Sequence, residues 1–347
     1  MTGPRRILVR LPSWVGDVVM ATPALRALGA GFPDAEVVVE ARPFLRGIVE
    51  PLAYVGSFLA DPGKGWRALS RRTRTLRGER FDLAVLLPDS QRAALAPFLA
   101  RVPRRVGYAR DLVRRALVTD ALRPEREGRG WKPISMVERY LRVTRYLGCA
   151  DQGRRMDVPV LEDARAAVAE RLAAEGVDAG ARLLVAVCGA SYGSSKLWPA
   201  ERFGAACARL AGELGLEPVL APGPGEEEVS RAVVATAGTG RVLADPVAGL
   251  GELAALIERA TLVLTNDTGP RQMAVALGIP AVVLMGPTDP RYTEHDLERQ
   301  RVLRAADVEC SPCGLKRCPI DHRCMTRIEV DGVVSAAAEL LSTPAPA

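Results

Sequence analysis

Short apolar runs alternate along the chain with longer stretches in which apolar residues return every three or four positions. Aliphatic and β-branched runs that end at Gly, Pro, Asn or Asp predict strands buried in a parallel sheet, and the longer stretches predict amphipathic helices. The predicted strands are residues 6–11, 35–40, 81–87, 106–108, 183–187, 217–220, 262–265 and 281–285, and the predicted helices include 135–147, 162–175, 250–260 and 330–341. This alternation predicts the α/β class, with open, doubly wound sheets.

A chain of 347 residues, of which 48% are hydrophobic, is long enough to bury two cores, so we expect two domains. A polar stretch without periodicity, residues 150–159, is expected to join them. The predicted domains are 1–160 and 161–329, followed by 330–347 as a C-terminal helix and a Pro/Ala tail that we expect to be disordered. No apolar run approaches the roughly 20 residues of a membrane span, and no signal peptide is visible, so we expect a cytoplasmic protein.

The stretch from Leu262 to Pro290 carries the most informative turn. It reads LVLTNDTGPRQMAVALGIPAVVLMGPTDP, which predicts a strand, a tight turn, a helix and a second strand. A helix that begins near Pro270 points unpaired N–H groups and the positive end of its dipole at the turn, which favours a phosphate or diphosphate there. Gly269 would let the backbone come close to such a ligand. The alternative is that the three residues before it, Asn266, Asp267 and Thr268, only cap the helix.

A second strand-to-helix turn follows the first predicted strand and reads PSWVGD, residues 12–17. Asp17 is expected at the start of the helix, where its carboxylate either caps the helix or faces a ligand at the carboxyl end of the strand. An ionised carboxylate in that position could accept a proton from a substrate hydroxyl. Gly16, directly before it, indicates a close backbone approach or an unusual φ.

A third loop, residues 188–196, follows the predicted strand 183–187 and reads CGASYGSSK. Its hydroxyls, its free N–H groups and the ammonium of Lys196 suit a diphosphate. The patterns GxxxxGK[ST] and GxGxxG after a strand are both absent, which argues against P-loop nucleotide hydrolysis and NAD binding. The acidic turn GPGEEE, residues 223–228, offers a carboxylate to ribose or sugar hydroxyls; alternatively its glutamates complement a helix dipole.

Charge is divided unevenly along the chain. Residues 1–155 hold 29 basic and 15 acidic side chains, a balance of +14, and residues 156–347 hold 18 and 26, a balance of −8. A cationic first half suits a polyanion such as nucleic acid, anionic lipid or a phosphorylated glycan; the alternative is a solvated face in an arginine-rich protein. Aromatic residues make up only 5% of the chain, which argues against a nucleic-acid binder that stacks bases.

Four of the seven cysteines crowd into one segment, as Cys310, Cys313, Cys318 and Cys324. Their spacing is metal-like, and tetrahedral zinc is the first ion to consider for thiolates in a cytosolic chain. The alternative is that these side chains act as small buried hydrophobes. The other three, Cys149, Cys188 and Cys207, are isolated and are expected in the core.

Three of these stretches together resemble the lipopolysaccharide heptosyltransferases of glycosyltransferase family 9. They are RLPSWVGDVVMATPALRAL (10–28), GASYGSSKLWP (189–199) and TNDTGPRQMAVALGIPAVVLMGPTDP (265–290), in that order. The form PSWVGD is most similar to the heptosyltransferase II branch. The resemblance runs from Arg6 to about Leu341 and includes the cysteine cluster.

The resemblance implies a GT-B fold, in which two Rossmann-like doubly wound domains face each other across a cleft. It implies transfer of heptose, with inversion, from ADP-heptose on the second domain to an anionic inner-core lipopolysaccharide acceptor, heptosyl-Kdo-lipid A, on the first. The acceptor would place the enzyme at the inner membrane leaflet, and its phosphates would account for the +14 balance of the first half.

The resemblance also assigns roles to residues, and it requires no cofactor. Asp17 would be the general base, and Lys196 with the N–H groups of Asp267, Thr268 and Gly269 would stabilise the departing ADP diphosphate. Substrate contacts are expected from the motif positions Ser13, Gly16, Ser191, Ser195, Glu226, Asn266, Asp267, Thr268, Gly269, Arg271 and Gln272.

The chain departs from the family at one position. The last motif usually reads DTGxxH, and this chain has Arg271 and Gln272 after Pro270. Histidine can be charged when it binds a phosphate, whereas glutamine donates only as a neutral group. A different donor sugar or acceptor is therefore one alternative function, and a non-catalytic binder of sugar nucleotides or polyanions is another.

Overall fold

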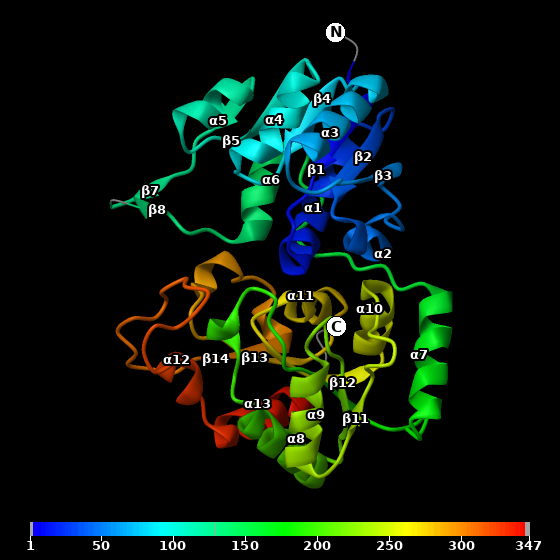
Figure 1. Cartoon of the computed structure of the whole chain (residues 1–347), viewed down its shortest axis with the longest axis vertical. Coiled ribbons are helices and arrows are strands. Elements are labelled where there is room, and N and C mark those ends of the chain that lie inside the picture. The colour runs from blue at the N-terminus through cyan, green and yellow to red at the C-terminus, as the bar shows by residue number, and fades with distance from the viewer. Residues whose placement is uncertain (1–2, 129, 344–347) are drawn as a thin grey trace. The chain divides into compact units, whose positions relative to one another are not determined.

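The computed structural model describes residues 3–128 and 130–343, and these form two compact units, Met1–Asp157 and Val158–Ala347 (Figure 1). The predicted Pro/Ala tail falls mainly on 344–347, which lie outside the described residues. In the part of the chain that the structure describes, every helix is too short or too polar to cross a membrane.

The first unit is built on a six-stranded parallel sheet with the order β3-β2-β1-β4-β5-β6. The strands are β1 Arg6–Arg10, β2 Glu36–Ala41, β3 Ser57–Ala60, β4 Leu83–Leu86, β5 Arg104–Tyr108 and β6 Asp120–Leu122. The helices are α1 Val15–Gly31, α2 Arg46–Val49, α3 Trp66–Glu79, α4 Gln91–Leu99, α5 Leu112–Leu117 and α6 Met136–Tyr146. A small antiparallel hairpin, β7 Arg126–Glu127 and β8 Gly130–Trp131, precedes α6.

Both faces of this sheet are covered, which explains why its central strands read as unbroken apolar runs. Leu8 and Val38 pack with Leu76 of α3 and Ala94 of α4 on one face. Ile7 points to the opposite face because side chains alternate along a strand, and it is fully buried there. Helices α1 and α6 pack against each other. The doubly wound architecture predicted from the sequence is confirmed for this unit.

Four charged side chains are buried at the carboxyl end of β1, β2 and β3. Arg10 donates to Asp61 at 2.5 Å, and Arg72 of α3 makes a two-pronged pair with Glu40, with one bond of 2.6 Å. Arg10 also lies 3.6 Å from Glu40. Because all four are nearly removed from solvent, each charge depends on the others for compensation.

The second unit repeats the same winding, with the parallel strand order β11-β10-β9-β12-β13-β14. The strands are β9 Leu183–Val187, β10 Glu217–Leu220, β11 Arg241–Val242, β12 Ala260–Asn266, β13 Ala281–Leu284 and β14 Gln300–Leu303. The helices are α7 Glu162–Ala174, α8 Ala200–Leu214, α9 Glu227–Ala237, α10 Leu250–Glu258, α11 Gly269–Ala276, α12 Arg323–Thr326 and α13 Val330–Ser342.

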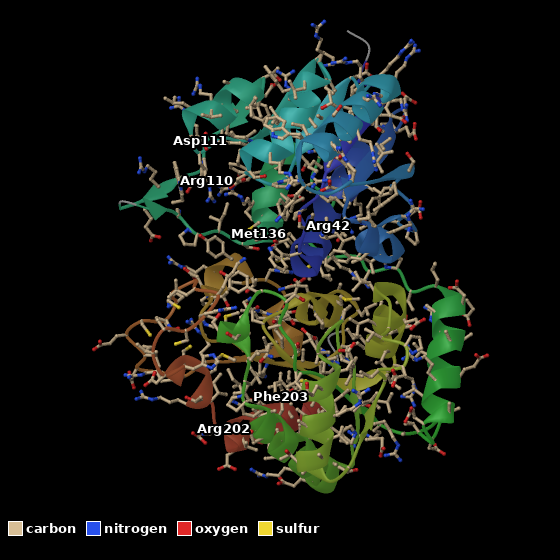
Figure 2. All side chains as sticks on the ribbon, in the orientation of Figure 1. Arg42, Arg110, Asp111, Met136, Arg202 and Phe203 are labelled. Carbon is tan, nitrogen blue, oxygen red and sulfur yellow. The ribbon has the colours of Figure 1, made fainter. Side chains whose placement is uncertain are left out.

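The C-terminal helix α13 is part of this unit's core, although the sequence led us to set residues 330–347 apart. Val333 and Leu340 of α13 pack in one cluster with Phe203 of α8. Figure 2 labels Phe203. The rings of Phe203 and Trp198 pack edge to face, with their centroids 5.2 Å apart. The isolated Cys188 and Cys207 are buried in the same cluster, as predicted, and Cys149 is buried in the first unit.

Candidate functional site

Asn266 fixes the turn between β12 and α11 through hydrogen bonds of its side-chain amide. Its amide nitrogen donates to the Cys188 carbonyl oxygen at 2.8 Å, and its amide oxygen accepts from Trp198 N–H at 3.3 Å. Asn266 is fully buried, so it ties the ends of the adjacent strands β9 and β12 together. This role fits the bonds better than the direct substrate contact that the motif suggested.

Asp267 lies at the centre of a polar cluster in the second unit, which also contains Lys196, Arg271 and Thr288. Its Oδ1 accepts from Arg271 at 2.8 Å, and its Oδ2 accepts from Lys196 at 2.9 Å and from the Thr288 hydroxyl at 2.6 Å. Burial by itself would raise the pKa of this carboxyl, but the charges of Lys196 and Arg271 and the hydrogen bonds from Thr288 and Lys196 lower its pKa to about 2. Asp267 is therefore ionised at neutral pH.

Lys196 is the only lysine among the described residues of this cluster, and it ends the short 3₁₀ turn Ser194–Lys196. Its ammonium donates to both the carboxylate and the carbonyl oxygen of Asp267, the latter at 2.6 Å, and lies 5.2 Å from the centre of the Tyr192 ring. An ammonium has three N–H donors, so one is left for a ligand after these two bonds.

One part of the predicted phosphate site is wrong. The Asp267 N–H donates to the Leu284 carbonyl oxygen at 3.0 Å, because it continues the ladder between β12 and β13, and so it cannot also bind a diphosphate. Thr268 is the N-cap residue of α11, and Gly269 and Pro270 begin the helix. The first N–H groups of a helix have no acceptor within it, so the N–H groups of Thr268 and Gly269 stay predicted phosphate donors.

Arg271 and Gln272 point into the protein interior, with 1% and 2% of their surface exposed. The Arg271 guanidinium donates to Asp267, to Gln300 at 2.9 Å and to the Thr293 hydroxyl at 2.8 Å, so its charge is used within the protein. Gln272 differs, because its Oε1 is buried and has no hydrogen-bond partner among the described residues. The sequence did not indicate Thr288, Thr293 or Gln300, although Thr288 shortly follows a predicted strand, where polar residues often serve a site.

Glu226 lies over the carboxyl end of β9. Its Oε2 accepts from Gly223 N–H at 2.9 Å, and a Cβ placed on Gly189 would fall only 1.7 Å from that oxygen. Glu226 is the N-cap residue of α9 without a side-chain capping bond, and Glu227 and Glu228 occupy the first turn. Glu227 and Glu228 are therefore placed to complement the helix dipole. Glu226 faces the end of β9, where a carboxylate for ribose or sugar hydroxyls was expected.

Ser191 and Ser195, both predicted to contact substrate, lie in different environments. Ser191 is exposed, whereas Ser195 is buried and its hydroxyl donates to the Leu315 carbonyl oxygen at 2.5 Å. Ser195 therefore holds the loop in place, and Ser191 stays a predicted ligand contact.

The predicted base, Asp17, belongs to the first unit, in the first turn of α1. Trp14 is the N-cap residue of that helix, so Asp17 does not cap it. Burial raises the pKa of Tyr140 in α6 well above its usual range, and the negative charge of Asp17 acts in the same direction, which puts the carboxylate near α6. Ser13 is exposed, and Gly16 is half-buried beside Asp17.

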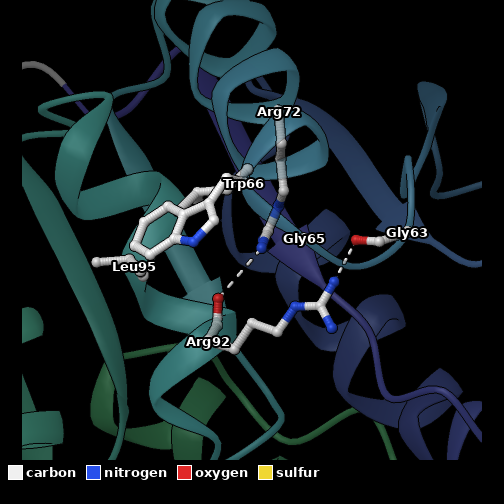
Figure 3. Close-up of a pocket in the computed structure, with 7 residues that line it drawn as sticks. Gly63, Gly65, Trp66, Arg72, Arg92 and Leu95 are labelled. Carbon is white, nitrogen blue, oxygen red and sulfur yellow. Dashed lines mark hydrogen bonds between the residues drawn. The ribbon is translucent and has the colours of Figure 1, made fainter.

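A pocket of about 220 Å³ opens in the first unit between the start of α3 and α4. Its walls include Trp66, Leu95 and the buried Arg72, and Figure 3 shows Arg72 donating to the Arg92 carbonyl oxygen at 3.3 Å. Arg92 in turn donates to the Gly63 carbonyl oxygen, which pins the loop before α3. The pocket thus combines an indole face with guanidinium groups.

The four clustered cysteines lie near one another in the second unit. Burial raises the pKa of the Cys324 thiol, and Cys313, Cys318 and Cys310 raise it further. Within residues 3–128 and 130–343, however, no group of three or more His, Cys, Asp or Glu side chains is placed to hold a metal ion. The zinc hypothesis has no support in this arrangement and stays a prediction, which metal analysis of the purified protein and of Cys313→Ser would test.

A family model described as glycosyltransferase family 9 (heptosyltransferase) matches residues 69–323. The chain belongs to glycosyltransferase family 9. Over 311 residues, which are 86% of this chain and 88% of the relative, it is 30% identical to lipopolysaccharide heptosyltransferase 2 of Salmonella typhimurium.

Solved structures of this family agree with the fold. The structure of E. coli ADP-heptose lps heptosyltransferase II superposes with a TM-score of 0.78 at 26% identity, covering 97% of this chain and 98% of that one. E. coli heptosyltransferase WaaC with ADP-2-deoxy-2-fluoro heptose gives 0.66 at 19% identity, covering 96% and 99%. The predicted GT-B fold is confirmed, and so is the resemblance to heptosyltransferases of family 9.

Proposed function

We propose that this family 9 glycosyltransferase moves L-glycero-D-manno-heptose from ADP-heptose to the inner core of lipopolysaccharide, with heptosyl-Kdo-lipid A as acceptor. The observation that carries the proposal is the Lys196 ammonium, held by Asp267 beside the first turn of α11. A fixed cation next to a helix N-terminus favours a diphosphate as leaving group. The names of the heptosyltransferase relatives support the choice of sugar and acceptor.

The proposed reaction is a single displacement with inversion. An acceptor hydroxyl oxygen attacks the anomeric carbon while the bond from that carbon to the ADP oxygen breaks, and ADP leaves with the bonding electrons. Asp17 takes the hydroxyl proton, and Lys196 with the N–H groups of Thr268 and Gly269 stabilises the negative charge that develops on the diphosphate. The transfer needs no metal or other cofactor, since these groups supply the positive charge.

For the donor, we assign the ADP moiety to the second unit. Glu226 accepts from Gly223 through one oxygen, and its other oxygen is suited to a ribose hydroxyl at the end of β9. Ser191 and the free oxygen of Gln272 are further candidate contacts for hydroxyl groups. The ADP-sugar analogue bound by the E. coli heptosyltransferase WaaC supports this class of donor.

For the acceptor, we assign the first unit. The pocket beside Trp66 offers an indole face to a sugar ring and guanidinium groups to an anionic substituent. Trp66 and Leu112 are each 84% exposed, and the exposed Arg67 and Arg115 lie within three positions of them in the sequence. Apolar side chains among cationic ones suit the anionic surface of a membrane, so we propose a cytoplasmic enzyme that binds the inner leaflet peripherally.

A different donor sugar is a second candidate, and Gln272 is the observation that favours it. A buried, unpartnered amide oxygen selects for a ligand group that donates a hydrogen bond at that point. The experiment that separates the two candidates measures ADP release from ADP-heptose with heptosyl-Kdo-lipid A, beside a panel of other nucleotide sugars. Fastest turnover of ADP-heptose supports the main proposal, and preference for another donor overturns it.

A further inference from the structure

The cysteine-rich segment, which we define as residues 308–326, lies against the serine loop, residues 189–196. Ser195 makes most of this contact. Its N–H donates to the Lys316 carbonyl oxygen at 3.1 Å, and its hydroxyl donates to the Leu315 carbonyl oxygen at 2.5 Å. The carbonyl oxygen of Ser195 lies 2.7 Å from Nε2 of His322. Each polar group of Ser195, the residue directly before Lys196, is thus bound by the cysteine-rich segment.

The same segment also meets the serine loop at Tyr192 and Gly193. The Tyr192 hydroxyl donates to the Gly314 carbonyl oxygen at 2.6 Å. Gly193 has a φ of +154°, and a Cβ there would lie 2.3 Å from the Lys316 carbonyl oxygen, so only glycine permits this approach. The two backbones are therefore in close contact over several residues.

On its other side, the cysteine-rich segment is fixed to the loop that follows β13. Gly314 N–H donates to the Pro287 carbonyl oxygen at 2.8 Å, and the Ser311 hydroxyl donates to the Gly286 carbonyl oxygen at 2.7 Å. Cys324 and Met325 pack so closely on Gly286 that a Cβ there would lie 2.8 Å and 2.6 Å from their sulfur atoms. The next residues of this loop include Thr288, which donates to Asp267.

The cysteine-rich segment therefore contacts both the serine loop, which carries Lys196, and the loop after β13. That second loop carries Thr288, which donates to Asp267. We propose that the cysteine-rich segment is the positioning element of the donor site, and that His322 is its positioning residue for Lys196. Because Ser195 O is an acceptor, the Nε2 atom of His322 carries the proton and donates. This inference rests on the proposed function for the role of Lys196 in diphosphate binding.

His322 is suited to this task by its own backbone. It has a left-handed φ of +59° at the start of α12, and its N–H donates to Cys318 Sγ at 3.3 Å. With the backbone of His322 fixed in this way, its imidazole contacts the serine loop at the Ser195 carbonyl oxygen. Glutamine has a side chain of similar length with a neutral N–H donor, so it should make the same hydrogen bond to the Ser195 carbonyl oxygen.

The test compares His322→Leu with His322→Gln in the full chain. His322→Leu should weaken ADP binding, measured by calorimetry, about tenfold, the factor that one lost hydrogen bond of about 1.4 kcal/mol represents. The KM for ADP-heptose should rise by a similar factor, and His322→Gln should restore both values to within about twofold. Arg165→Gln in α7 is the control, since Arg165 lies outside the cysteine-rich segment and pairs with Glu162 and Glu258, and it should leave ADP binding unchanged.

Hydrogen exchange of the serine loop supplies a readout that needs no ligand. In His322→Leu the amides of residues 193–197 should exchange faster than in the wild type, and in His322→Gln they should not. Unchanged exchange in His322→Leu overturns the positioning role, whatever the enzyme binds. Failure of the wild type to bind ADP would instead overturn the proposed function, while the exchange data would still decide this inference.

Discussion

The Lys196 ammonium donates to the Asp267 carboxylate at 2.9 Å and to the Asp267 carbonyl oxygen at 2.6 Å, with only 12% and 7% of the two side chains exposed. The two residues lie in loops that follow adjacent parallel strands, β9 and β12, and are 71 positions apart in the chain. Removing either member of such a buried pair leaves the charge of the other without compensation, which strongly destabilises the folded protein.

Asp267→Asn should lower stability at neutral pH, because Lys196 and Arg271 would lose their shared anion. We expect a loss of about 3 to 5 kcal/mol in the free energy of unfolding, measured by urea denaturation at pH 7. The folded-state pKa of about 2 lies below the ordinary value of 3.8, so the wild type gains this stabilisation above pH 4 and loses it as the pH falls towards 2.

The same measurement at lower pH checks the sign. Between pH 4 and pH 2 the difference between wild type and Asp267→Asn should shrink by about 2 kcal/mol, as the carboxylate of the wild type takes up its proton. A difference that stays constant over this range would contradict the lowered pKa. Asp163→Asn, an exposed change in the first turn of α7, is the control.

Asp17→Asn should remove the proton acceptor and leave ADP binding intact, since Asp17 belongs to the first unit and the proposed ADP contacts to the second. We expect kcat to fall by about 10²- to 10⁴-fold, the usual contribution of a general base. ADP release gives kcat, and calorimetry with ADP serves as the binding control. A variant that keeps most of its kcat would exclude Asp17 as the base.

Glu40→Gln should destabilise the first unit, because Arg72 and Arg10 would keep their buried charges without this carboxylate. We expect a loss of about 3 to 5 kcal/mol by chemical denaturation. Glu36→Gln is a matched change at the other end of β2, where the pair with Arg6 is 41% exposed on the Glu36 side, and it should cost less than about 1 kcal/mol. Equal losses in both variants would show that burial does not set the strength of these pairs.

Gln272→Leu should separate stability from function. The substitution removes a buried amide oxygen that has no partner among the described residues, so the free energy of unfolding should stay equal or rise slightly. The kcat/KM for the donor should fall about tenfold if that oxygen accepts a hydrogen bond from the sugar nucleotide. A stable variant with unchanged kcat/KM would remove Gln272 from the donor site.

Trp66→Ala and Leu112→Ala together should weaken binding to vesicles that contain anionic lipid, because both side chains are exposed on the basic first unit. Sedimentation with such vesicles at low and high salt measures the effect, which should be several-fold at low salt. The control is Leu297→Ala, which changes an exposed leucine of the second unit and should bind the vesicles as the wild type does. Equal binding by all three proteins would place the membrane contact elsewhere.

The sequence by itself determined the two doubly wound sheets and most of their central strands. Residues 183–187 and 217–220 form strands with the predicted bounds, because a strand buried on both faces is mostly apolar: 183–187 reads LLVAV, and only Glu217 of 217–220 is charged. The four edge strands β3, β6, β11 and β14 escaped prediction, since strands of two to four mostly half-buried residues carry too little pattern. The motifs also determined the family, which three separated stretches identify without any knowledge of their contacts.

Only the tertiary structure decided which motif residues are left for ligands. Asn266, Asp267 and Ser195 have the residue types of a phosphate site, yet their bonds go to Cys188, Lys196 and Leu315. The sequence cannot reveal this, because each of those partners is at least 71 residues away and is brought near by parallel strand order and by the return of the cysteine-rich segment. Whether a polar side chain serves a ligand or the fold depends on how many of its hydrogen bonds the protein already satisfies.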